Sequence, residues 1–70
     1  MTKAELLKRL YGLGGGVAEV AGIIERCYRN PVAMLRKLNA LYTGGAVIKA
    51  HGNENMEING RLVGIVEALA

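Results

Sequence analysis

Arg36, Lys37 and Asn39 are the side chains of this sequence with the clearest capacity to recognise a nucleic acid. The Arg36 guanidinium can form a bidentate contact with guanine, and the Asn39 amide can pair with adenine in the same way. Two adjacent cations are equally typical of a solvated helix surface, so both interpretations stay open. Either one requires the surrounding segment to be a helix that buries its apolar side.

The sequence lacks the groupings that catalysis or metal binding needs. Cys27 and His51 are the only soft ligand candidates, and two ligands do not make a zinc site. Cys27 is predicted to be a small buried hydrophobe, because no neighbouring histidine and acid would activate its thiol. Glu54 and Glu57 would need a pocket to act as a catalytic pair, and 70 residues leave little room for one. We therefore expect no enzyme, no metal and no cofactor.

The glycine run 14–16 also has two interpretations. Its backbone could cradle a phosphate, which would suit a protein that binds small anionic ligands. However, it lacks the lysine and the serine or threonine of a phosphate-binding P-loop, and it follows a predicted helix rather than a strand. A helix stop is the favoured interpretation.

Length and composition limit the class of protein. The 70 residues fit one domain, 1–70, and 51% of them are hydrophobic, so we expect a homo-oligomer that hides surplus apolar surface. The net charge of +3 permits acidic partners such as DNA. The single cysteine excludes an internal disulfide and favours a reduced, cytoplasmic setting. No apolar run reaches the roughly 18 residues of a membrane span, and the first ten residues do not form a secretory signal, so no membrane partner is expected.

Three helices are predicted in the first part of the chain. Thr2 and Glu5 have capping-box spacing, which starts a helix over 3–12. A second helix should begin near Val17 and end by Arg29. The pair Asn30-Pro31 supplies an N-cap and a first-turn proline for a third helix over 31–42, which Thr43-Gly44-Gly45 closes. Its buried stripe is expected to consist of Met34, Leu35, Leu38, Leu41 and Tyr42.

The last third of the chain predicts a β-hairpin. Strands are expected over 46–51 and 56–58, with a turn over 52–55. The pair Asn59-Gly60 either turns into a third strand over 61–66 or caps a final helix. The spacing of Leu62, Ile65, Val66 and Leu69 favours the helix, which would close the core or form a dimer seam. The fold class is α+β: three N-terminal helices, a β-hairpin, and a short C-terminal helix as the favoured ending.

This order of elements resembles the winged helix-turn-helix DNA-binding domain. The resemblance is sharpest over 30–49, in the cap at Asn30, the leucines Leu38 and Leu41, the glycine Gly45 and the apolar strand start at 46–48. Residues 52–55 would then form the tip of the wing. The resemblance implies a small transcriptional regulator that reads duplex DNA with the helix over 31–42, as a dimer over two half-sites.

The resemblance also assigns residues to the interface. Arg36 and its neighbours on the third helix would face base edges, the start of that helix would hold a phosphate, and the wing would meet the DNA backbone. The expected DNA-binding residues are Arg29, Asn30, Ala33, Arg36, Lys37, Asn39, Lys49, His51, Asn53 and Asn55. Ala40 could join the reading helix, and Lys3, Lys8 and Arg9 could add phosphate contacts. The alternative is a non-enzymatic interaction protein, such as an assembly component or an inhibitor, that docks on another protein.

Overall fold

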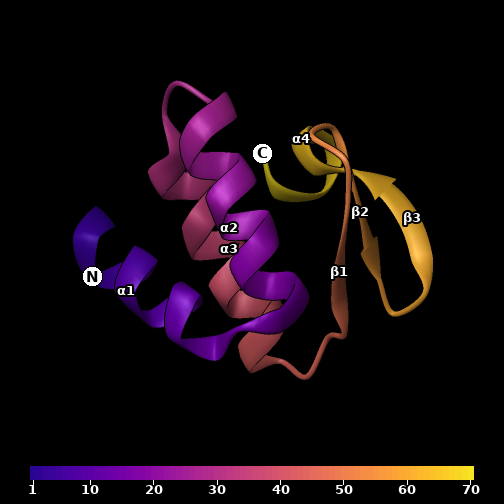
Figure 1. Cartoon of the computed structure of the whole chain (residues 1–70), viewed down its shortest axis with the longest axis horizontal. Helices are drawn as coiled ribbons and strands as arrows, with labels where there is room; N and C mark the ends of the chain where they lie inside the picture. Colours follow the sequence, from indigo (N-terminus) through magenta and orange to yellow (C-terminus); the bar gives the residue numbers. More distant parts are fainter.

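The computed structural model describes residues 1–70, and its helices precede its strands except for a short helix at the C-terminus (Figure 1). The order of elements is α1 (Lys3–Leu13), α2 (Gly15–Cys27), α3 (Pro31–Thr43), β1 (Ile48–His51), β2 (Asn55–Ile58), β3 (Arg61–Gly64) and α4 (Ile65–Leu69). The expected α+β class, with three helices followed by a hairpin and a short final helix, is confirmed. No helix is long and apolar enough to span a membrane.

The ends of α1 and α3 follow the signals in the sequence. The Thr2 hydroxyl accepts from the Glu5 N–H at 3.2 Å, and the Glu5 carboxylate accepts from the Thr2 N–H at 2.9 Å, which completes the capping box. At the other end of the helical region, Ala46 N–H donates to the Leu41 carbonyl and Gly45 N–H to the Tyr42 carbonyl. These two bonds form a Schellman motif, and Gly45 takes the positive φ of 95° that it requires.

The three strands form an antiparallel sheet in the order β1-β2-β3. Asn59 and Gly60 both have positive φ, 53° and 82°, and they join Ile58 to its cross-strand partner Arg61. This is the two-residue type I′ turn that Asn-Gly favours. The third strand predicted as an alternative therefore exists, and the favoured helix is wrong over 61–64. The chain becomes helical only at Ile65, once β3 has paired with β2.

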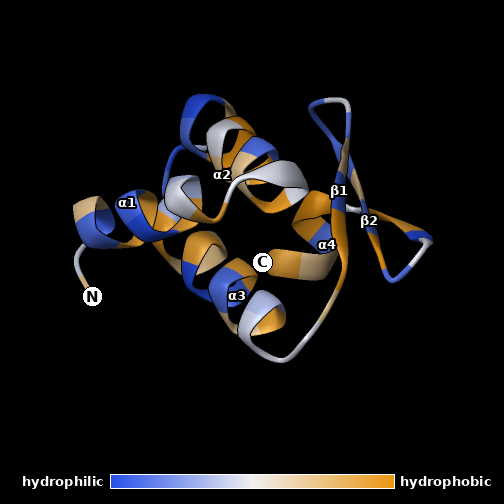
Figure 2. Cartoon of the chain, turned by 60° about the horizontal axis from the view of Figure 1, so that its bottom comes forward, coloured by the Kyte–Doolittle hydropathy of each residue, from blue (hydrophilic) through white to orange (hydrophobic).

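The core consists of 14 buried apolar residues in one cluster. Figure 2 shows the apolar sides of α1, α2 and α3 turned toward one another, with α4 between α3 and the sheet. Ile65 and Leu69 of α4 are fully or almost fully buried, while β1 and β2 contribute Ile48 and Met56. The C-terminal segment thus closes the core, one of the two roles predicted for it.

Several boundaries and burial predictions need correction. Helix α2 begins at Gly15 rather than near Val17, and its first turn meets β1 at Gly16. The Cys27 side chain is exposed, not buried, since α2 ends there and turns its last residue outward. Tyr42, predicted in the buried stripe of α3, is exposed in the last turn of the helix.

Tyr11 is also exposed, although the sequence places it in the apolar stripe of α1. Its hydroxyl donates to the Glu25 carboxylate at 2.8 Å, which links the outer edges of α1 and α2. This hydrogen bond raises the pKa of Tyr11, because the carboxylate favours the protonated phenol. The phenol therefore serves as a polar link on the surface rather than as core.

Gly16 marks the closest approach between the helices and the sheet. A β carbon on Gly16 would lie 2.0 Å from the Ile48 carbonyl oxygen of β1. Only glycine leaves room for the two backbones there. Gly14 and Gly15 have positive φ and connect α1 directly to α2, so the glycine run is the predicted helix stop.

Candidate nucleic-acid interface

The outward side of α3 carries the two neighbouring cations. Ala33, Arg36, Lys37 and Ala40 follow one another at helical spacing and are all exposed. The opposite side of the same helix buries Met34, Leu35 and Leu38. Neither cation is in an ion pair, because the single ion pair of the structure joins His51 and Glu57. The helix therefore presents an unneutralised cationic face to solvent.

The first turn of α3 has no side-chain cap. Asn30 occupies the N-cap position, as predicted, but its side chain makes no capping hydrogen bond, so the predicted side-chain cap is wrong. Its φ of −120° and ψ of 77° differ from the extended N-cap geometry seen at Thr2. The N–H groups of the first turn consequently have no side-chain acceptor. Arg29 and Asn30 are both exposed beside them.

The side of α3 that faces α1 is occupied by internal contacts. Arg9 Nε donates to Asn39 Oδ1 at 2.8 Å, and an Arg36 guanidinium nitrogen lies 3.5 Å from the Met1 carbonyl oxygen. Asn39 is half-buried in this seam. Its amide oxygen is therefore already engaged, unlike the free base-reading amide that the sequence suggests. The same bond holds Arg9 beside α3, so a third cation lies next to this helix.

The tip of the β1–β2 hairpin lies near the start of α3. The Tyr28 hydroxyl, in the α2–α3 connection, donates to the Asn53 carbonyl at 3.3 Å. Figure 1 shows the hairpin turn and the α2–α3 connection at the same end of the molecule. The bond brings the exposed Asn53 to the end of the molecule where Arg29 and Asn30 lie.

The outer face of the sheet is less cationic than the resemblance implies. Lys49, His51 and Asn55 are exposed there. However, Lys49 is the cross-strand partner of Glu57, and the His51 ring pairs with the Glu57 carboxylate. A carboxylate in the middle of this face opposes a close approach of phosphate. His51 is thus engaged within the hairpin, which weakens its expected role at a DNA backbone.

The expected residues consequently fall into three groups. Ala33, Arg36 and Lys37 share the exposed face of α3; Arg29, Asn30 and Asn53 share one end of the molecule; Lys49, His51 and Asn55 lie on the outer face of the sheet. Asn39 belongs to the α1–α3 seam. The fold brings the first two groups to α3 or to its start, whereas the third group lies apart from α3 on the β1–β2 hairpin.

One signal that would have sharpened the site is the distribution of charge. Between Glu25 and Glu54 there is no acidic residue, and the cations in that interval are Arg26, Arg29, Arg36, Lys37 and Lys49. This interval contains α3 and β1. By contrast, no local pattern predicts the Arg9–Asn39 and Tyr28–Asn53 bonds, whose partners are 30 and 25 residues apart in the chain.

Neither the models of protein families nor the curated proteins and solved structures compared with this chain gave a match.

Proposed function

We propose that this protein binds duplex DNA as a small dimeric regulator of winged helix-turn-helix type, with the exposed face of α3 in the major groove. The observation that carries the proposal is the cationic, acid-free outward face of α3, with Arg36 and Lys37 free of ion pairs. The β1–β2 hairpin, whose tip lies near the start of α3, would follow the adjacent backbone.

Physical chemistry supports this assignment in two ways. A major groove admits one helix, and α3 is held from behind by its buried leucines, so its outward side chains are presented on a rigid support. The uncapped first turn adds backbone N–H groups that favour an anion, with Arg29 beside them. Phosphate contacts would position the helix, and Arg36 would read a base edge.

The test is the affinity for a random duplex, measured by fluorescence anisotropy over a range of salt concentrations. If about four phosphates are neutralised per protomer, a bound dimer neutralises about eight, and log affinity falls against log salt with a slope of roughly −7. The double variant Arg36→Ala, Lys37→Ala should lose at least tenfold in affinity and show a shallower slope. The control is Arg26→Ala, which removes an exposed cation of α2 away from the α3 face and should weaken binding less than either single α3 variant.

Base preference distinguishes the recognition of specific bases from non-specific electrostatic attraction to DNA. Against a panel of duplexes, Arg36→Ala should flatten the preference, while Lys8→Ala should weaken all sequences alike. Full affinity and preference in the double α3 variant, or equal losses in the double variant and its control, would rule out α3 as the reading element.

A second candidate function rests on a different observation. Val47, Leu62 and Val66 are exposed by 59%, 59% and 51%, all in the C-terminal third of the chain. Such residues suit an assembly or inhibitor protein that docks on another protein. This function predicts no duplex affinity near physiological salt together with a protein partner that the triple variant Val47→Ser, Leu62→Ser, Val66→Ser no longer retains.

A further inference from the structure

The two edges of the sheet differ in whether another element covers them. At the β1 edge, α2 lies so close that Gly16 touches the Ile48 backbone, which leaves no space for another strand. The β3 edge has no neighbouring strand, because β3 ends the sheet order. Open edges invite pairing with another strand. The β3 edge is therefore the one place where the sheet can grow.

The backbone of β3 presents hydrogen-bonding groups along this open edge. Arg61 pairs with Ile58 across the two-residue turn, and further along Ile65 N–H donates to the Glu54 carbonyl at 2.8 Å. In an antiparallel ladder, alternate residues direct their N–H and C=O groups at the partner strand. The odd-numbered residues of β3 therefore direct their backbone N–H and C=O groups at β2. Leu62 directs its own N–H and C=O outward, away from the sheet.

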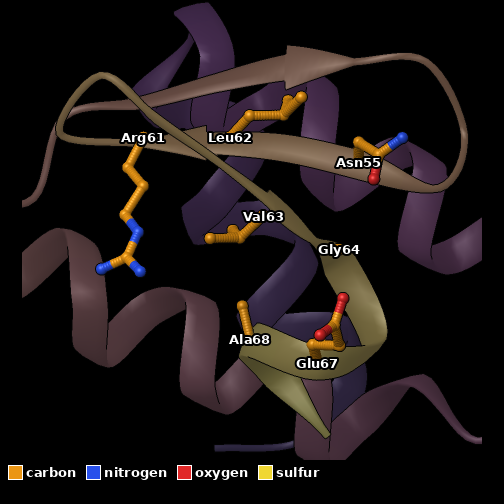
Figure 3. A pocket seen from close by; sticks show the side chains of 7 residues that line it. All are labelled: Asn55, Arg61, Leu62, Val63, Gly64, Glu67 and Ala68. Atoms are coloured by element: carbon orange, nitrogen blue, oxygen red, sulfur yellow. The ribbon is translucent and has the colours of Figure 1, made fainter.

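The side chains along this edge are suited to a second copy of the same edge. Leu62 is exposed by 59% on the outer face of the sheet. An open hollow of about 440 Å³ runs beside the strand, and the residues that line it include Val63 of β3, Ala68 of α4 and Asn55 of β2. Figure 3 shows Leu62 and Val63 pointing to opposite faces, with the hollow between β3 and α4.

The charges of the edge favour an antiparallel arrangement. Arg61 stands at the start of β3, and Glu67 lies beside Gly64 at its end (Figure 3). Neither is in an ion pair. A two-fold axis that lies between the two β3 strands, perpendicular to the sheet, places the cationic end of each copy beside the anionic end of the other, whereas a parallel arrangement brings like charges together.

We infer that two copies of this chain associate through their β3 edges, antiparallel about a two-fold axis, to form one continuous six-stranded sheet. Leu62 of one copy lies opposite Leu62 of the other, because antiparallel partners must share a face of the sheet. The pairing supplies partners for the outward N–H and C=O of Leu62 and covers both leucines. Since the edge is only four residues long, the dimer should dissociate in the micromolar range.

The first test is sedimentation equilibrium of the full chain without DNA, over a range of protein concentrations. Leu62→Lys should raise the dimer dissociation constant at least tenfold while keeping the fold, because the new amine lies across from Glu57. The matched control is Val47→Lys, which changes an equally exposed apolar residue outside β3 and should leave the dissociation constant within about twofold.

Amide hydrogen exchange followed by NMR supplies a second readout that needs no variant. Leu62 N–H should be protected at high protein concentration and lose that protection on dilution. Val63 N–H, which faces β2 within the same chain, should stay protected at both concentrations. This contrast is specific to edge pairing, because a dimer formed elsewhere leaves Leu62 N–H in contact with water at all concentrations.

A wild-type chain that is monomeric at every concentration overturns the inference, as does a dimer in which the Leu62 amide is unprotected or in which both lysine variants dissociate alike. The inference deepens the dimer named in the proposed function but does not use DNA contact. Loss of DNA binding in the α3 variants with an intact β3 dimer, or the reverse, therefore tells the two apart.

Discussion

Two N-cap residues of this protein differ in their hydrogen bonds, although both match the sequence signal for the start of a helix. Thr2 and Asn30 both occupy N-cap positions, but only the Thr2 side chain makes the capping bonds. The difference matters for function, because an uncapped first turn in α3 keeps its N–H groups available to an anion. At α1 the same groups are used internally.

The capping box at α1 predicts a pH dependence of stability. Hydrogen bonds from the Thr2 backbone and then its side chain lower the pKa of Glu5 below 4.5. A group with a lowered pKa in the folded state adds stability above its unfolded pKa, and this stability is lost as pH falls through the folded pKa. The wild-type chain should therefore lose part of its stability as the pH is taken below about 4.5.

Glu5→Gln isolates this contribution. Glutamine can keep the capping-box geometry but does not titrate. Urea unfolding followed by circular dichroism between pH 7 and pH 3 should show a smaller acid-induced loss for Glu5→Gln than for wild type. Identical pH profiles would mean that the Glu5 carboxylate does not contribute through the cap.

At the scale of elements, glycine decides how closely α2 approaches β1. The sequence identifies the run 14–16 as a break between helices but gives no sign that Gly16 is a packing contact. The contact appears only when β1, more than 30 residues later, is placed against the first turn of α2. It also closes the β1 edge and so leaves β3 as the open one.

Two glycine-to-alanine changes should have opposite effects. Gly16→Ala would place a methyl group 2.0 Å from the Ile48 carbonyl oxygen and should destabilise the fold by about 1–3 kcal/mol. Gly12→Ala lies in α1 with nothing near its new methyl group, and it should stabilise by about 0.5–1 kcal/mol. Thermal and urea unfolding measure both; a neutral Gly16→Ala would contradict the close packing of α2 on β1.

At the scale of the whole molecule, a five-residue helix closes the core. Figure 2 shows α4 between α3 and the sheet, and its Ile65 and Leu69 are almost completely buried. For 70 residues the total free energy of unfolding is on the order of 3.5–10 kcal/mol. One buried side chain at this junction can therefore decide whether the domain folds.

Leu69→Ala tests this role. Loss of a buried leucine typically destabilises by about 2–5 kcal/mol, so the variant should be largely or partly unfolded at 37 °C. Val66→Ala, in the same helix but half-exposed, should lose under about 1 kcal/mol. Equal stability of the two variants by urea unfolding would show that α4 does not close the core.

The sequence alone predicts the elements whose causes are local. The Thr2–Glu5 box, the Asn30-Pro31 start and the Gly44-Gly45 end predict α1 and α3 to within a residue or so, because caps and φ preferences act over three or four positions. The outward placement of Arg36 and Lys37 also follows from sequence, since helical periodicity fixes it once the leucines are buried.

The tertiary structure decided everything that depends on partners in other segments of the chain. Arg61–Gly64 became a strand because β2 offered an edge to pair with, although its own spacing favoured a helix. Asn39 was engaged by Arg9, Tyr28 reached Asn53, and α2 covered one edge of the sheet while the other stayed open. Local propensity contributes a few tenths of a kcal/mol per residue, and burial and strand pairing outweigh it wherever the fold brings two segments together.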